Sequence, residues 1–132
     1  YGHHPRELEV TFQAIRAAYP TRRLVSVFQP HRFTRTQDLF DDFVSVLTTA
    51  DALILLPVFA AGEAPIVGAE SKDLAKVIRQ MGRSQPVVEK DFEHVIERLS
   101  AIVEPNDVIL IQGAGSVGRL PGELIAALGG GR

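Results

Sequence analysis

The sequence predicts an α/β domain of the Rossmann-like, three-layer type, in which helices flank a mostly parallel sheet. Short apolar runs that suit buried strands alternate with longer amphipathic stretches along the chain, and this alternation is typical of layered α/β domains. The length of 132 residues suits one domain, so we expect residues 1–132 to form a single unit. Apolar residues make up 45% of the chain, which is typical of an ordinary globular core.

The composition also excludes several classes of protein. The chain has no cysteine, so disulfides and thiolate metal sites are excluded. The net charge of −2 gives no reason to expect nucleic acid or an anionic membrane as a partner. No apolar run approaches the ~20 residues that a spanning helix needs, and the start does not resemble a secretory signal. We therefore expect a cytoplasmic protein with no membrane association.

The first half of the chain alternates helix, strand, helix. A helix is predicted over 5–19, because apolar residues recur there at helical spacing and Pro5 suits the first helical position. A β-branched and aromatic run predicts a strand over 24–28. Thr34 and Gln37 then form a capping-box pattern, which predicts one helix beginning there and continuing through "DLFDDFVSVL".

The second half continues the alternation. The periodicity predicts the following elements in order: a strand over 52–58, a loop over 59–69, a helix over 71–81 closed by Gly82, a short strand over 86–88, a helix over 91–103, a strand over 108–111 and a helix over 120–128. The first helix has no strand before it. Because a helix of an α/β unit normally follows a strand, we expect the first strand or strands of the domain to precede residue 1.

A glycine motif follows the last predicted strand. Gly113, Gly115 and Gly118 have the G-x-G-x-x-G spacing of a dinucleotide-binding turn. Such a site needs a second strand and an acidic residue about 20 residues further on, and the short remainder of this sequence provides neither. The spacing therefore favours a tight strand-to-helix turn. A backbone contact to a phosphate or carboxylate stays open, and a non-catalytic nucleotide- or dinucleotide-binding module remains an alternative function.

The unusual polar residues gather where the predicted strands end. In open α/β sheets, ligands bind outside the carboxyl ends of the strands. The segments that we expect at this edge are 1–4, 29–36, 59–68 and 112–119. They contain three of the four histidines, so this edge is the predicted site.

Three groups of residues carry this prediction. His3 and His4 precede a helix, where His4 either caps the helix or contacts a ligand; no third metal ligand accompanies them, so we expect no metal site. Arg32 and Arg35, with His31 beside them, suit a carboxylate or phosphate if the turn is helical and places both guanidinium groups on one face.

Glu63 is the third group. It is an acid between small residues in the loop over 59–69, and it suits an ammonium group or an arginine; a plain surface loop is the alternative. Gly62 and Gly68 in the same loop permit positive φ or a close approach of backbone.

Four motifs together resemble a known family. "YGHHP", "FQPHRFTRT", "LLPVFAAGEAPIVGAES" and "GAGSVG" occur in this order over nearly the whole chain. They resemble the C-terminal domain of the Mur ligases, in the branch that adds L-alanine to UDP-N-acetylmuramate during peptidoglycan synthesis. The murein-peptide recycling ligases share the His-His-Pro stretch but lack the "HRFTRT" pattern, and they are the closest alternative.

The resemblance implies a three-domain enzyme. An N-terminal domain binds the UDP-sugar, a central domain binds ATP and Mg²⁺, and the C-terminal domain brings the amino acid, so UDP-N-acetylmuramate, L-alanine, ATP and the other domains are the implied partners. The implied reaction is ATP-dependent amide formation through an acyl phosphate. This chain has no G-x-x-x-x-G-K-[ST] motif, so we expect it to be inactive alone and to hold no cofactor tightly.

The resemblance also implies roles for individual residues. His4, Arg32 and Arg35 would face the L-alanine substrate, and Tyr1 and His3 would lie at the nucleotide interface. The residues implied as further loop contacts are His31, Glu63, Gly113 and Gly115.

Overall fold

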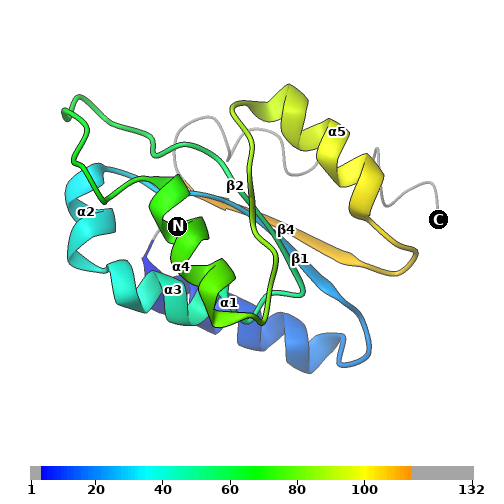
Figure 1. Ribbon diagram of the computed structural model, residues 1–132. Helices are drawn as coiled ribbons and strands as arrows, with labels where there is room; N and C mark the ends of the chain where they lie inside the picture. Colours follow the sequence, from blue (N-terminus) through cyan, green and yellow to red (C-terminus); the bar gives the residue numbers. More distant parts are fainter. Residues whose placement is uncertain (1–3, 114–132) are drawn as a thin grey trace.

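The computed structural model describes residues 4–113, and its centre is a four-stranded parallel sheet (Figure 1). The strand order is β3-β2-β1-β4, and every pair of neighbours runs parallel. The strands are β1 (Leu24–Gln29), β2 (Ala52–Leu55), β3 (Val87–Val88) and β4 (Val108–Gly113). The predicted α/β class is therefore confirmed.

Helices connect the strands, as parallel pairing requires. They are α1 (Pro5–Ala18), α2 (Phe33–Asp38), α3 (Phe40–Leu47), α4 (Ser71–Met81) and α5 (Phe92–Ile102). α1, α3 and α4 cover one face of the sheet and α5 lies on the other, which gives three layers (Figure 1). α2 lies at one end of the sheet, beyond the carboxyl end of β1 (left in Figure 1).

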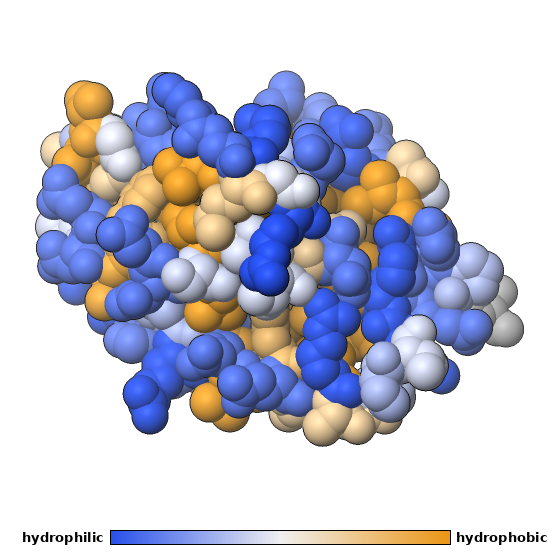
Figure 2. Space-filling view, turned by 60° about the horizontal axis from the view of Figure 1, so that its bottom comes forward, coloured by the Kyte–Doolittle hydropathy of each residue, from blue (hydrophilic) through white to orange (hydrophobic). Residues whose placement is uncertain are grey.

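Each face of the sheet has its own apolar core. The larger core packs α1, α3 and α4 against alternate residues of β1 and β2, with Leu8, Phe28, Phe43 and Leu74 fully buried. The smaller core packs α5 against the other face and includes Leu99. Burying one such side chain contributes about 1.5–3 kcal/mol. The outer surface of the helices α1, α3 and α4 is mainly polar, with apolar side chains in separate places (Figure 2).

The central strand β1 is buried, and its carboxyl end lies at the edge of the sheet where the site is predicted. All six of its residues are buried, because strands pair with it on both sides and helices cover both faces. Phe28 is in register with Leu55 of β2 and with Gln112 of β4. The carboxyl ends of these three strands therefore lie at one edge of the sheet, as predicted.

Two predicted elements differ from the structure by more than one or two residues at an end. The single helix expected after Thr34 is two helices, α2 and α3, which meet at Leu39 with φ −113° and ψ 22°. Thr34 is not the cap expected from the capping-box pattern: it lies inside α2, and the backbone of Arg32 occupies the N-cap position. β2 is shorter than predicted, because Pro57 has no N–H to donate to a neighbouring strand.

Helix ends with local signals agree closely with the predictions. α4 has the predicted bounds, with Glu70 and Asp73 forming a capping box at its start. Gly82 ends it in the left-handed conformation, with φ 77°. The predicted helix over 120–128 and the glycine turn beyond Gly113 lie outside the described residues, and the strand expected before residue 1 remains a prediction.

Candidate functional site

Two loops join at the carboxyl edge of the sheet. The backbone N–H of Arg32 donates to the carbonyl of Phe59 at 2.7 Å, and the N–H of Phe59 donates to the carbonyl of Pro30 at 2.8 Å. The rings of His31 and Phe59 stack with centroids 5.6 Å apart and planes 14° apart. The loop after β1 therefore pairs with the loop after β2 beyond the ends of both strands.

A tight turn then directs Glu63 back toward α2. The N–H of Glu63 donates to the carbonyl of Ala60 at 3.0 Å, and the two residues between them have positive φ, 51° at Ala61 and 88° at Gly62. This geometry is that of a type I′ turn. The left-handed conformation costs Ala61 about 1–2 kcal/mol, whereas Gly62 adopts it freely, as its sequence position predicted.

The Glu63 carboxylate binds the first turn of α2. Oε1 accepts from the backbone N–H of Thr34 at 3.1 Å, and Oε2 accepts from the Thr34 hydroxyl at 2.6 Å. Oε2 also accepts from Nε of Arg32 at 3.2 Å. The Thr34 hydroxyl and N–H are the main reason that the pKa of Glu63 falls to about 2, so the carboxylate is ionised at neutral pH. Its side chain is only 15% exposed.

Arg32 holds its guanidinium group partly open to solvent. Its backbone has φ 72°, a positive value that is uncommon outside glycine, and 49% of its side chain is exposed. Only Nε is bonded within residues 4–113, so Nη1 and Nη2 are available to a ligand as far as the described chain shows. Arg35, on α2, forms no ion pair within this part of the chain and is half-buried.

The charges of both arginines reach His31. Burial lowers the pKa of His31, and the positive charges of Arg35 and Arg32 lower it further, while Glu63 opposes them. The imidazole is therefore mainly neutral at pH 7. The predicted common helical face is wrong in one respect, because Arg32 precedes α2 and does not have a helical backbone conformation. The two guanidinium groups still act on the same imidazole.

His4 lies at the start of α1 and caps it. Its Nδ1 accepts from the backbone N–H of Arg6 at 3.1 Å, and it lines a groove of about 270 Å³ with Asp42 and Val46. Of the two roles left open for His4, the structure shows the cap, and the ligand contact stays a prediction. The interactions found in residues 4–113 do not join His4 to Arg32 or Glu63.

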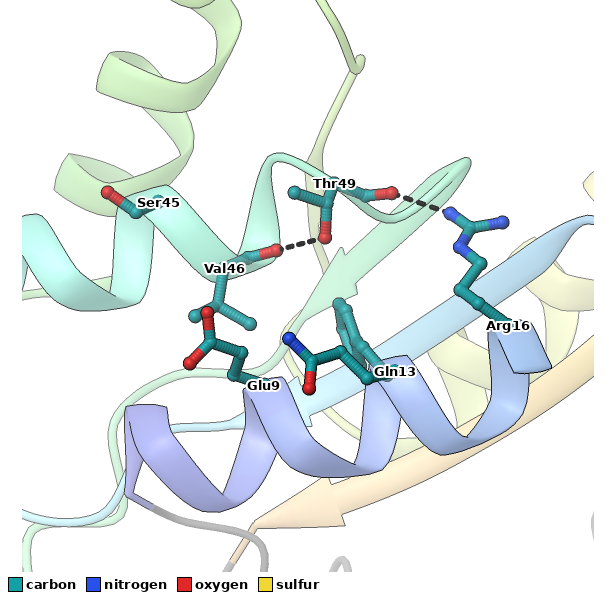
Figure 3. A pocket seen from close by; sticks show the side chains of 7 residues that line it. Glu9, Gln13, Arg16, Ser45, Val46 and Thr49 are labelled. Atoms are coloured by element: carbon teal, nitrogen blue, oxygen red, sulfur yellow. Dashed lines mark hydrogen bonds between the residues drawn. The ribbon is translucent and has the colours of Figure 1, made fainter.

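A second groove continues along α1 and α3 (Figure 3). It has a volume of about 350 Å³, and Arg16 at its end donates to the carbonyl of Thr49 at 2.7 Å. Arg16 also pairs with Asp51 at 2.8 Å, so its donors are engaged in holding the turn before β2. The described residues that line this groove therefore provide no free cation for an anionic ligand.

The remaining predicted residues divide between described and undescribed positions. Gly113 ends β4 and is in register with Gln29, one residue before the loop that carries the arginines. Tyr1, His3 and Gly115 lie outside the described residues.

Sequence reasoning missed two participants in the site, Thr34 as a donor to Glu63 and Phe59 as the ring that stacks on His31. The capping-box pattern predicted Thr34 as a helix cap together with Gln37, not as a donor to Glu63.

Two kinds of feature are absent from the described residues. In residues 4–113, no group of three or more His, Asp or Glu side chains is arranged to hold a metal ion. None of the helices in this range combines the length and apolar character that crossing a bilayer requires.

Comparison with known proteins identifies the family. The family model described as "Mur ligase, glutamate ligase domain" matches residues 1–115. The UDP-N-acetylmuramate–L-alanine ligase of Paraburkholderia phytofirmans is 52% identical over 94% of this chain, and that of Aromatoleum aromaticum is 50% identical over 96%. The chain spans 27% of the length of each of these relatives.

A solved structure shows the same fold at lower identity. It is described as a domain of a UDP-N-acetylmuramate:L-alanyl-gamma-D-glutamyl-medo-diaminopimelate ligase from Haemophilus ducreyi, with a TM-score of 0.68 and 21% identity over 97% of this chain and 86% of that one. At this identity the likeness shows the fold alone. The family-model match and the relatives at about half identity together show that the chain belongs to the Mur ligase family.

Proposed function

We propose that the chain is the amino-acid-binding domain of a cytoplasmic ligase that joins L-alanine to UDP-N-acetylmuramate with ATP. The observation that carries the proposal is the cationic edge formed by Arg32 and Arg35. Two guanidinium groups, one with its terminal nitrogens unbonded in the described chain, suit the carboxylate of an amino acid. The relatives that are 50% and 52% identical to this chain over the aligned region are named for the same reaction.

The proposed chemistry is amide formation in two steps. The lactyl carboxylate of UDP-N-acetylmuramate attacks the γ-phosphorus of ATP, giving an acyl phosphate and ADP. The amine of L-alanine then attacks the acyl carbon and loses a proton, and inorganic phosphate leaves. The contribution of this chain is to bind and orient the amine nucleophile, and orientation of this kind accounts for a large part of enzymatic rate enhancement.

Each candidate residue has a proposed role in this scheme. Arg32 and Arg35 bind the carboxylate of L-alanine, and His4 lies on the substrate side. Tyr1 and His3 contribute to the nucleotide interface. The further loop residues that we propose as part of the site are His31, Glu63, Gly113 and Gly115.

ATP and Mg²⁺ are bound, in this proposal, mainly by the part of the enzyme outside this chain. The sequence contains no G-x-x-x-x-G-K-[ST] phosphate loop. The described residues also offer no set of three metal-ligating side chains. The isolated chain should therefore show no ligase activity.

The test uses a chimera in which residues 1–132 replace the matching segment of the Paraburkholderia relative. We expect ADP release that depends on both L-alanine and UDP-N-acetylmuramate. Arg32→Ala should raise the KM for L-alanine about 10- to 100-fold, the effect of losing charge-assisted hydrogen bonds. Arg22→Ala is the matched control. Arg22 is exposed and stacks on Tyr19, the residue that follows α1.

The same chimera separates the alternatives. An unchanged KM in Arg32→Ala would overturn the carboxylate assignment. Activity with a murein tripeptide in place of L-alanine would favour the recycling ligase. Saturable binding of NAD to the 132-residue chain, followed by amide chemical shifts, would favour a dinucleotide-binding module.

A further inference from the structure

We infer that Glu63 is a positioning residue that fixes the guanidinium group of Arg32 so that Nη1 and Nη2 face the carboxylate of the amino acid. The inference rests on the proposed function and adds to it a residue that acts through Arg32. Glu63 does not touch the substrate in this account. Its contact with Nε leaves the Nη1 and Nη2 edge of the Arg32 guanidinium group available to the substrate.

The anchor of Glu63 is independent of Arg32. Thr34 donates to both carboxylate oxygens, through its N–H to Oε1 and through its hydroxyl to Oε2. The type I′ turn at Ala61 and Gly62 brings the carboxylate to this position. Glu63 therefore stays at the start of α2 whether or not Arg32 is bound to it.

The contact with Arg32 uses one edge of the guanidinium group. A guanidinium is planar and rigid, so fixing Nε against Oε2 at 3.2 Å also restricts where Nη1 and Nη2 can point. The terminal edge then offers two parallel N–H donors, which match the two oxygens of a carboxylate. A flexible arginine would have to be ordered on binding, and the entropy lost in ordering it would weaken the affinity for the carboxylate.

The structure also decides between the two partners that the sequence left open for Glu63. Both oxygens already accept hydrogen bonds, and the side chain is 15% exposed, so little of it can reach an ammonium group. Its partner is the arginine. A second reading is that Glu63 occupies the place of the substrate carboxylate and competes with it, and this reading makes the opposite prediction for affinity.

The test compares Glu63→Gln with Glu70→Gln in the chimera. The glutamine keeps an oxygen that can accept from the N–H of Thr34, but it loses the charge that holds Arg32. We expect the KM for L-alanine to rise about tenfold with kcat within about twofold, the effect of one charge-assisted hydrogen bond. Glu70 caps α4 in a similar way and has no contact with Arg32 in the described chain, so Glu70→Gln should leave both constants unchanged.

The double variant that combines Glu63→Gln with Arg32→Ala distinguishes a positioning role of Glu63 from a general disruption of the site. If Glu63 acts through Arg32, Glu63→Gln should add nothing to the KM of Arg32→Ala. Additive effects, an unchanged KM or a lower KM in Glu63→Gln would each overturn the inference, and a lower KM would support competition instead. If Arg32→Ala itself has no effect on KM, the carboxylate assignment fails, and the inference fails with it.

A milder variant provides the same test if Glu63→Gln does not fold. Thr34→Val removes only the hydroxyl that donates to Oε2 and leaves the N–H in place. We expect it to raise the KM for L-alanine about threefold, with no further effect in the Arg32→Ala background. An unchanged KM in a folded Thr34→Val variant would contradict the anchoring role of Thr34 and with it the inference.

Discussion

Replacing Asp107 with asparagine should destabilise the fold measurably. Asp107 precedes β4, and its carboxylate accepts from Arg23, the residue before β1, through Nε at 3.1 Å and Nη2 at 2.8 Å. The N–H of Glu104 also donates to it at 2.8 Å. Nη2 of Arg23 further donates to the carbonyl of Ile102 at 2.9 Å. The pair therefore fastens the end of α5 and the start of β4 to the start of β1.

The magnitude follows from the burial of the two partners. The Asp107 side chain is 3% exposed and that of Arg23 is 36% exposed, so solvent screens the arginine but hardly the carboxylate. Hydrogen bonds to a charged group contribute about 1.5–3 kcal/mol, and the partial exposure of Arg23 favours the lower half of that range. We expect Asp107→Asn to lower the free energy of unfolding by about 2 kcal/mol, which lowers Tm by about 8 °C.

The pH dependence gives a second test of the same contact. Burial alone would raise the pKa of Asp107, but hydrogen bonds from Arg23 and from the N–H of Glu104 outweigh it, and the pKa lies below its usual value of 3.8. A folded-state pKa below the unfolded value contributes stability above pH 3.8, and this stability is lost as the pH falls through the folded pKa. The difference in free energy of unfolding between the wild-type chain and Asp107→Asn should therefore become smaller in acid.

Urea unfolding followed by circular dichroism, at pH 7 and at several values below pH 4, measures both effects. Asp38→Asn is the matched control, because Asp38 is exposed and has no bonded partner in residues 4–113. The reasoning would be refuted if Asp107→Asn lowered the free energy of unfolding by less than about 0.5 kcal/mol at pH 7. It would also be refuted if the difference between wild type and variant stayed constant as the pH fell.

Two further predictions concern the smaller core and the site. Leu99→Ala should lower the free energy of unfolding by about 3 kcal/mol in the same urea assay, because Leu99 is fully buried on the side of α5 that packs against the sheet. Ile96→Ala, on the exposed side of α5, should lower it by less than about 1 kcal/mol. Equal losses would contradict the assignment of the packed face. The ¹³C resonance of the Glu63 carboxyl should titrate near pH 2, so its contribution to stability is present above pH 4.5 and lost as the pH falls toward 2; a midpoint at or above 4 would show that Thr34 does not hold the carboxylate.

The sequence predicts elements well where the signals are local. α4 was predicted with its observed bounds, because its apolar residues recur at helical spacing and Gly82 supplies the left-handed end. The helix start near Thr34 was predicted two residues late. The group that caps α2 is the carboxylate of Glu63, which is 29 residues away along the chain, and no local pattern contains it.

The candidate site shows the same division. His31, Arg32, Arg35 and Glu63 were each selected as candidates from residue type and position after a predicted strand. The sequence left an arginine open as the partner of Glu63 but did not identify Arg32, because this pairing depends on the parallel register of β1 with β2 and on a turn in which Ala61 has an unfavourable backbone conformation. The stacking of His31 on Phe59 depends on the same register.

The backbone hydrogen bonds between the loops at residues 30–32 and at Phe59 have a thermodynamic consequence. Because the two loops are already paired in the free chain, the entropy lost in ordering them belongs to folding and not to ligand binding. A carboxylate that meets Arg32 there encounters a rigid receptor. Calorimetry of a small anionic ligand should therefore show a heat-capacity change too small for coupled folding of a loop, and amide exchange at Arg32 and Phe59 should be slow before the ligand is added.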